Sequence, residues 1–167
     1  IVSAILALML VGAGVALMGI HVFERDSSGF YSTGTATLRT PTYALASDGL
    51  DVGTDVPGWA IGHDRLGAIR ISVTSRNGRG VFVGIARTPD ARSYLRGVQH
   101  DELVDLRVSP LSVTSVRRIG TVAPARPDGE SFWAAFASGA GRQELRWTIV
   151  KGDWSVVLMN ADASRGV

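Results

Sequence analysis

The chain has 167 residues, and its 17 Lys and Arg against 15 Asp and Glu give a formal net charge of +2. The basic residues are scattered singly apart from the pair Arg117-Arg118, so we expect no nucleic-acid partner. There is no cysteine, which excludes disulfides, cysteine metal ligands and thiol nucleophiles.

The first segment, residues 1–23, contains no charged side chain. As a helix it would span roughly 34 Å, enough to cross a bilayer core of about 30 Å. A cleaved signal peptide is the competing interpretation. Its apolar region is usually shorter and ends in small residues, whereas this run ends in the larger residues 20–23. We therefore expect a single retained transmembrane α-helix in the cell membrane.

Small residues in this segment indicate that the helix could pack against another helix. Gly12, Ala16 and Gly19 are spaced so that two helices could approach closely in lipid. Besides the lipid bilayer, the expected partners are other membrane or envelope proteins, or a second copy of the chain. A pilin-like filament subunit is a further alternative, although residues 1–10 lack the acidic side chain that type IV pilins carry near the start of this helix.

The rest of the chain has the composition of a linker followed by one domain. Residues 24–34 are predicted to be a linker, and the net acidic residues 24–26 favour an extracytoplasmic position for the domain. Residues 35–167 have the size of a domain with its own core. Short edge strands are expected at 35–39 and 43–45, before a loop rich in Gly and Asp.

The first clear strand is predicted at 68–74, where branched apolar residues alternate with polar ones. A second strand, apolar on both faces, is predicted at 81–86. The intervening Asn77-Gly78 pair is a strong turn signal because both residues tolerate positive φ. The two strands are therefore expected to pair as an antiparallel hairpin.

One short helix is predicted after these strands. Thr88 offers a capping hydroxyl, Pro89 suits the first helical position, and Asp90 faces the positive end of the helix. Gly97 is placed to end the helix.

The remaining segments alternate with a period of two and are predicted to be strands. They are 102–108, 113–117, 131–137, 144–150 and 153–159. The connections at 138–141 and 151–152 suit tight hairpins. The predicted fold is mainly β, an antiparallel β-sandwich or jelly-roll-like domain with one short helix, preceded by the transmembrane helix.

Four blocks of this chain resemble a family of uncharacterised actinobacterial membrane proteins. They are residues 81–86, 94–102, 132–134 and 152–162, and the last block, GDWSVVLMNAD, is the most specific. The resemblance implies a first membrane helix, an extracytoplasmic β-rich domain and a further C-terminal membrane segment, which this sequence does not include. It implies no activity and no catalytic residues.

The residues offer few candidates for chemistry. His100-Asp101-Glu102 could form a metal or proton-transfer corner, but polar residues that satisfy the backbone where the short helix meets the next strand are the favoured interpretation. No nucleophile motif, phosphate-binding loop or metal-ligand set is found, so we expect no catalytic residue, metal or cofactor.

Tryptophans are the other candidates, because they could stack on a sugar. The strand periodicity predicts that Trp147 and Trp154 lie in the core, and that Trp133 lies on the opposite face from Phe132. Trp59, on a loop, is the candidate ligand-binding residue.

Together these features predict a membrane-anchored extracytoplasmic domain. We expect it to act as a non-enzymatic accessory or scaffold subunit of a cell-envelope assembly. The alternative is a module that binds an envelope ligand or glycan through Trp59. An enzyme is the third class, and a concave pocket that contains His100 beside Asp101 or Glu102 would favour it.

Overall fold

The computed structural model describes residues 38–47, 49–52, 68–108, 111–148 and 150–167. The predicted transmembrane helix at 1–23 and the linker at 24–34 lie outside these ranges and stay predictions. Among the described residues, no helix combines the length and the apolar character needed to cross a membrane.

Within the described ranges the chain forms nine strands, one α-helix and one 3-10 turn. The strands are β1 (Ala44–Ser47), β2 (Leu50–Val52), β3 (Ala68–Thr74), β4 (Val81–Arg87), β5 (His100–Val108), β6 (Leu111–Arg118), β7 (Ala135–Gly139), β8 (Arg142–Thr148) and β9 (Gly152–Asn160). The helix is α2 (Thr88–Tyr94), and the 3-10 turn is η1 (Pro127–Gly129). The prediction of a mainly β chain with one short helix is confirmed.

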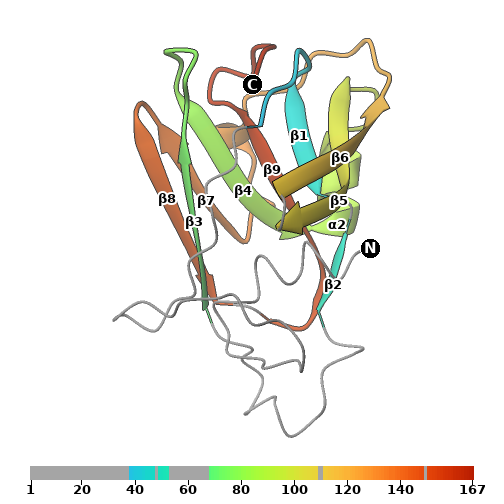
Figure 1. Ribbon diagram of the computed structural model, residues 1–167, viewed down its shortest axis with the longest axis vertical. Coiled ribbons are helices and arrows are strands. Elements are labelled where there is room, and N and C mark those ends of the chain that lie inside the picture. Colours follow the sequence, from blue (N-terminus) through green and yellow to red (C-terminus); the bar gives the residue numbers. More distant parts are fainter. Residues whose placement is uncertain (1–37, 48, 53–67, 109–110, 149) are drawn as a thin grey trace, which may run out of the picture.

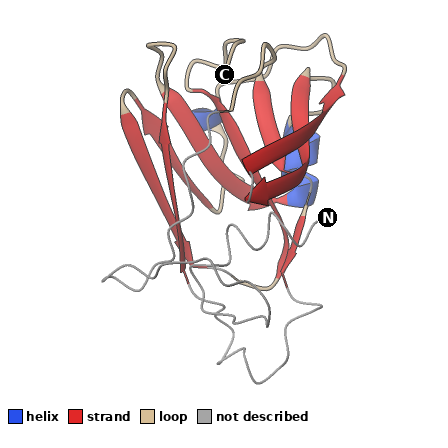
Figure 2. Cartoon of the chain, viewed as in Figure 1, coloured by secondary structure: helices blue, strands red, loops and turns tan. Residues whose placement is uncertain are grey.

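The strands form two sheets (Figures 1 and 2). A seven-stranded sheet has the order β6-β5-β1-β9-β4-β7, with β2 pairing with the first residues of β9. A two-stranded sheet consists of β3 and β8. The larger sheet is mixed rather than purely antiparallel as predicted, because β1 runs parallel to β5. A parallel pair needs a long crossover, and here it contains β3, β4 and α2.

The predicted hairpin between 68–74 and 81–86 does not form. β3 pairs with β8 over all seven residues, while β4 pairs with β7 and β9. The Asn77-Gly78 turn is present, with Gly78 at φ 77°, but it carries the chain from one sheet to the other. The connections at 138–141 and 151–152 also join strands of different sheets. Alternation in the sequence defines the faces of a strand, but it does not define the neighbouring strand.

The two faces of the larger sheet bury separate apolar clusters. Ile69 and Leu145 of the two-stranded sheet pack against Val83 and Val156 on one face. Trp154 belongs to this cluster, and Trp147 packs against it with ring centroids 4.7 Å apart, so both were predicted correctly as core residues.

The opposite face is covered by α2 and by the segment around Trp133. Ala91 and Leu95 pack there with Phe82 and Trp133. Trp133 is only 8 % exposed, and its indole Nε1 donates a hydrogen bond to the Pro127 carbonyl oxygen at 2.8 Å. Strand β7 begins at Ala135, after Trp133. The period of two therefore does not apply to Trp133 and could not predict on which face its side chain lies.

Helix α2 begins where the sequence indicates, but with a different cap. Arg87 occupies the N-cap position and makes no side-chain capping bond. The buried Thr88 hydroxyl instead donates to Asp153 Oδ1 at 2.8 Å and lies 3.0 Å from the Ser155 hydroxyl. Thr88 therefore fastens the helix to β9 rather than capping it.

Candidate functional site

The candidate residues that the sequence singled out for binding are not among those the structure describes. Trp59 and the helix-packing residues Gly12, Ala16 and Gly19 lie outside the described ranges. Their roles stay predictions, and the candidate sites are formed by described residues of the β-domain.

The His100-Asp101-Glu102 corner has a structural role. His100 begins β5, and its Nδ1 lies 2.8 Å from the Val98 carbonyl oxygen. Asp101 pairs with Arg117 and Glu102 with Arg118, so two consecutive carboxylates of β5 are bound by two consecutive arginines of β6. In the described part of the chain no three potential ligands gather to hold a metal ion. The contact of His100 with the Val98 backbone fits the favoured interpretation, whereas Asp101 and Glu102 fasten β6 to the sheet through side-chain ion pairs.

Asp101 is the most tightly held of these residues. Its side chain is 7 % exposed, and both of its oxygens accept hydrogen bonds from Arg117, at 2.8 and 3.1 Å. The Thr40 hydroxyl donates a further bond at 2.7 Å. These bonds, with that from Arg117 foremost, hold the pKa of Asp101 below its ordinary value of 3.8, although burial acts in the opposite direction.

Strand β6 is the last strand on its side of the seven-stranded sheet, so one edge has no partner among the described strands (Figures 1 and 2). Residues 114–118 are all exposed. Three apolar side chains on this strand and just after it are exposed to solvent, and we call them the β6 patch. They are Val116 at 42 % exposure, Ile119 at 90 % and Val122 at 53 %.

The segment that carries the patch is held firmly to the loop after α2. The backbone N–H of Val122 donates to the Gly97 carbonyl oxygen at 2.9 Å, and Val122 forms a parallel bridge with Val98. Gly120 lies so close that a Cβ there would meet the Gly97 oxygen at 2.2 Å. The apolar side chains are therefore presented on a fixed backbone.

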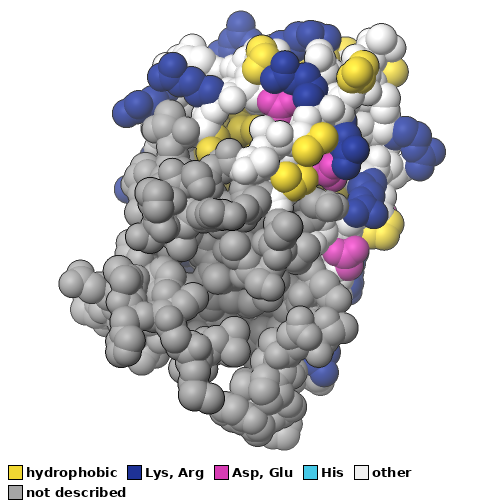
Figure 3. Space-filling model, turned by 45° about the vertical axis from the view of Figure 1, so that its right-hand side comes forward, with side chains coloured by type: hydrophobic (Ala, Val, Ile, Leu, Met, Phe, Trp, Pro, Cys, Tyr) yellow, Lys and Arg dark blue, Asp and Glu magenta, His cyan; other side chains and the backbone are white. Residues whose placement is uncertain are grey.

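Arginine predominates around this side of the molecule. In the space-filling view, which brings the right-hand side of Figure 1 forward, Lys and Arg side chains surround scattered hydrophobic and a few acidic ones (Figure 3). Arg117 and Arg118 are paired, whereas Arg96 is exposed beyond α2.

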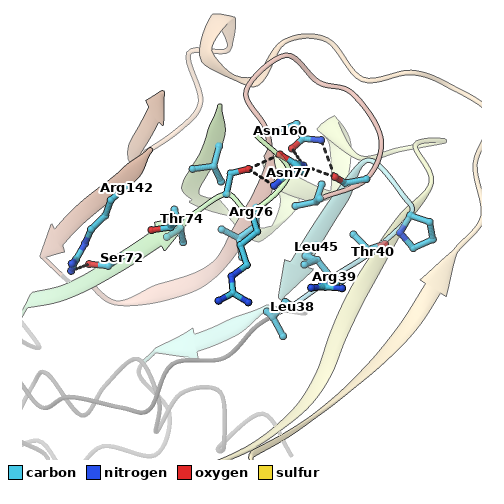
Figure 4. A pocket seen from close by; sticks show the side chains of 17 residues that line it. Leu38, Arg39, Thr40, Leu45, Ser72, Thr74, Arg76, Asn77, Arg142 and Asn160 are labelled. Carbon is cyan, nitrogen blue, oxygen red and sulfur yellow. Dashed lines mark hydrogen bonds between the residues drawn. The ribbon is translucent and has the colours of Figure 1, made fainter. Parts of the chain in front are cut away.

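A second candidate site lies between the two sheets. A cavity of about 980 Å³ opens beside β3, whose outer edge pairs with no described strand. Its lining comes from five parts of the chain: residues 38–41 with Leu45, residues 72–77 with Val81, Arg142, Leu158 with Asn160, and residues 166–167. Figure 4 shows Arg76 lying between Ser72 and Thr74 on one side and Leu38 and Leu45 on the other.

Neither candidate site was predicted from the sequence. The only signal for the β6 patch was the apolar character of Ile119 and Val122 in a stretch otherwise rich in arginine and glycine. The cavity had no signal, because it forms where β3 leaves the larger sheet to pair with β8.

Comparison of the chain with protein-family models, with curated proteins and with solved structures finds no match in any of the three. The resemblance to actinobacterial membrane proteins therefore stays a prediction from the four sequence blocks. A further cavity of about 410 Å³ has His100, Glu102 and Arg118 in its lining. The proposals below rest on the β6 patch and on the larger cavity.

Proposed function

We propose that this protein is a membrane-anchored, extracytoplasmic β-sandwich domain that serves as a non-enzymatic accessory or scaffold subunit of a cell-envelope assembly. The observation that carries the proposal is the β6 patch, in which Ile119 is 90 % exposed beside a sheet edge that pairs with none of the described strands. The occupant that fits is an extended segment of another envelope protein.

The chemistry of a sheet edge supports this occupant. An unpaired edge offers backbone N–H and C=O groups in a row, and an added strand can satisfy them while its side chains contact the neighbouring apolar residues. Natural edge strands are usually blunted by charge or by irregularity. Here the arginines are neutralised by Asp101 and Glu102, and Val116 and Ile119 are left to make contacts.

The membrane anchor is the second part of the proposal. Residues 1–23 contain no charged side chain and are long enough to cross a bilayer as a helix. Such a tether would confine the domain to the membrane surface. There the high local concentration of a neighbouring membrane protein would raise the occupancy of a weak contact at β6.

The patch is tested by placing a charge on it. We expect Ile119→Asp to lower the recovery of the partner at least tenfold, because a carboxylate would have to be desolvated in an apolar contact. The measurement is quantitative mass spectrometry of proteins that co-purify with the tagged full chain from native membranes after cross-linking.

Thr121→Asp is the matched control, since it adds the same charge two residues away on an exposed side chain that is not apolar. It should leave recovery within about twofold. A solitary monomer in native membranes, or equal losses with both variants, would contradict a partner at β6.

The anchor is tested by alkaline carbonate extraction. We expect the full chain to stay in the membrane pellet and a chain lacking residues 1–23 to be released, because only the apolar segment holds the protein in lipid. Sequencing the N-terminus of mature material is the companion measurement. A mature chain that begins after residue 23 would show that the segment is a cleaved signal and would refute the anchor.

A further inference from the structure

We infer that the cavity between the two sheets is a binding site for an anionic amphiphile, a molecule with one apolar chain and one carboxylate or phosphate head. This site is separate from the β6 patch and does not depend on the proposed function.

The inner wall of the cavity is apolar. Leu45 and Val81 come from β1 and β4 and are 4 % and 7 % exposed, and Leu158 from β9 lies between these strands in the sheet. Leu38 and Val73 extend this surface toward the opening. A hydrocarbon chain can bury its apolar surface against such a wall.

The opening is basic. Arg39, Arg76 and Arg142 reach it from the segment before β1, the turn after β3 and the start of β8, and all three are exposed. Figure 4 shows the guanidinium groups of Arg39 and Arg76 on the same side of the cavity. Guanidinium groups bind carboxylate and phosphate through paired, charge-assisted hydrogen bonds.

Among the described residues, little negative charge offsets these arginines. The described lining contains no Asp or Glu, and Arg39 and Arg76 form no ion pair within the described part of the chain. Arg142 donates to the neutral Ser72 hydroxyl at 3.2 Å, and its charge also acts on Glu144, which lies outside the lining. A ligand with a cationic or neutral head group would therefore bind here with lower affinity than a ligand with an anionic one.

The buried polar residues of the lining, Asn160 and Thr40, already use their side-chain donors and have none to spare for an anionic head group. The Asn160 amide donates to the carbonyl oxygens of residues 164–166, and its Oδ1 accepts from Asn77 at 3.0 Å. The buried Thr40 hydroxyl donates to Asp101. The anionic head is therefore placed at the arginines of the opening, with its apolar chain directed inward.

The volume suits a ligand of this kind. Small-molecule sites usually measure about 300–1,000 Å³, and this cavity lies at the upper end of that range. A single acyl chain with its head group is thus of appropriate size.

The test is photolabelling of the full chain in phosphatidylcholine nanodiscs. The probe is a palmitic acid analogue with a diazirine in its chain, and its methyl ester is the neutral counterpart. We expect the acid to label peptides that contain Leu45, Val81 and Leu158, and the ester to label them at least tenfold less. Unlabelled palmitate and lysophosphatidic acid compete, and the stronger competitor identifies the head group as carboxylate or phosphate.

The double variant Arg39→Gln, Arg76→Gln should reduce labelling by the acid at least tenfold, because each lost charge-assisted contact costs affinity. Arg96→Gln removes one positive charge outside this cavity and should leave labelling unchanged. Circular dichroism verifies that each variant is folded. Labelling confined to residues 1–23, equal labelling by acid and ester, failure of both competitors, or an equal loss with Arg96→Gln would overturn the site.

Discussion

Replacing Phe82 with alanine should lower the free energy of unfolding by about 3–5 kcal/mol, a large share of the roughly 5–15 kcal/mol that stabilises a typical domain. Phe82 is fully buried and lies at the centre of the cluster under α2, with its ring centroid 5.0 Å from that of Trp133. A Cβ on Gly84 would meet the Phe82 ring at 2.7 Å, so the ring fills the space above that glycine. Removing the ring leaves a cavity that the surrounding strands can fill only in part.

Thermal or denaturant unfolding, followed by tryptophan fluorescence, measures this loss. Phe136→Ala is the matched control, because Phe136 stacks on Phe82 at 5.7 Å but is 47 % exposed. It should cost about 1 kcal/mol or less. If both variants lose the same stability, the cluster beneath α2 is not the main core of this face.

Replacing Asp101 with asparagine should lower the free energy of unfolding at neutral pH by about 1–2 kcal/mol. The variant loses the charge that binds Arg117 and keeps only neutral hydrogen bonds, including one to Thr40. The expected loss is modest because the Arg117 side chain is half exposed and water screens the pair.

The loss should depend on pH in a defined direction. The folded pKa of Asp101 is lowered below 3.8, so the folded state favours the charged carboxylate more than the unfolded state does. Its stabilising contribution is complete above the ordinary pKa and disappears as the pH falls through the lowered folded pKa. The stability difference between wild type and Asp101→Asn should therefore be constant from about pH 6 to 8 and should shrink as the pH falls below the ordinary pKa of 3.8.

Denaturant titrations across this pH range provide the measurement. Glu144 and Asp162 also have lowered pKa values, through hydrogen bonds from Arg146 and Ser164 respectively, so the wild type alone cannot report on Asp101. Asp128→Asn is the control, because Asp128 pairs with an exposed arginine in a surface turn. A difference that does not shrink as the pH falls below 3.8 would show that Asp101 contributes through packing and not through charge.

The elements of the fold followed from local patterns in the sequence. Alternation placed the strands at 68–74 and 153–159, and Thr88-Pro89-Asp90 marked the start of α2, because these signals depend only on neighbouring residues. Trp133 was predicted on the opposite face from Phe132, but the two rings lie together in the cluster under α2. Trp133 lies just before a regular strand, where the period of two does not apply.

The pairing of the strands could not be derived in the same way. Nothing in the residues of β3 distinguishes β8 from β4 as its partner, and the Asn77-Gly78 turn suggested the nearer strand. Both candidate sites result from strand pairing: the cavity opens where β3 departs from the larger sheet, and the patch is exposed because β6 ends that sheet. Local sequence patterns do not contain this information.

The position of β1 has a consequence for how the protein folds. This short strand lies between β5 and β9, so that Ala44 faces His100 on one side and Met159 on the other. Pairing residues so distant in the sequence closes large loops, and the entropy of loop closure is lost before the new contacts contribute any stability. This slows folding. On the ribosome the sheet stays open at its centre until β9 has emerged. During synthesis, the early strands are thus exposed to premature association until β9 has been added.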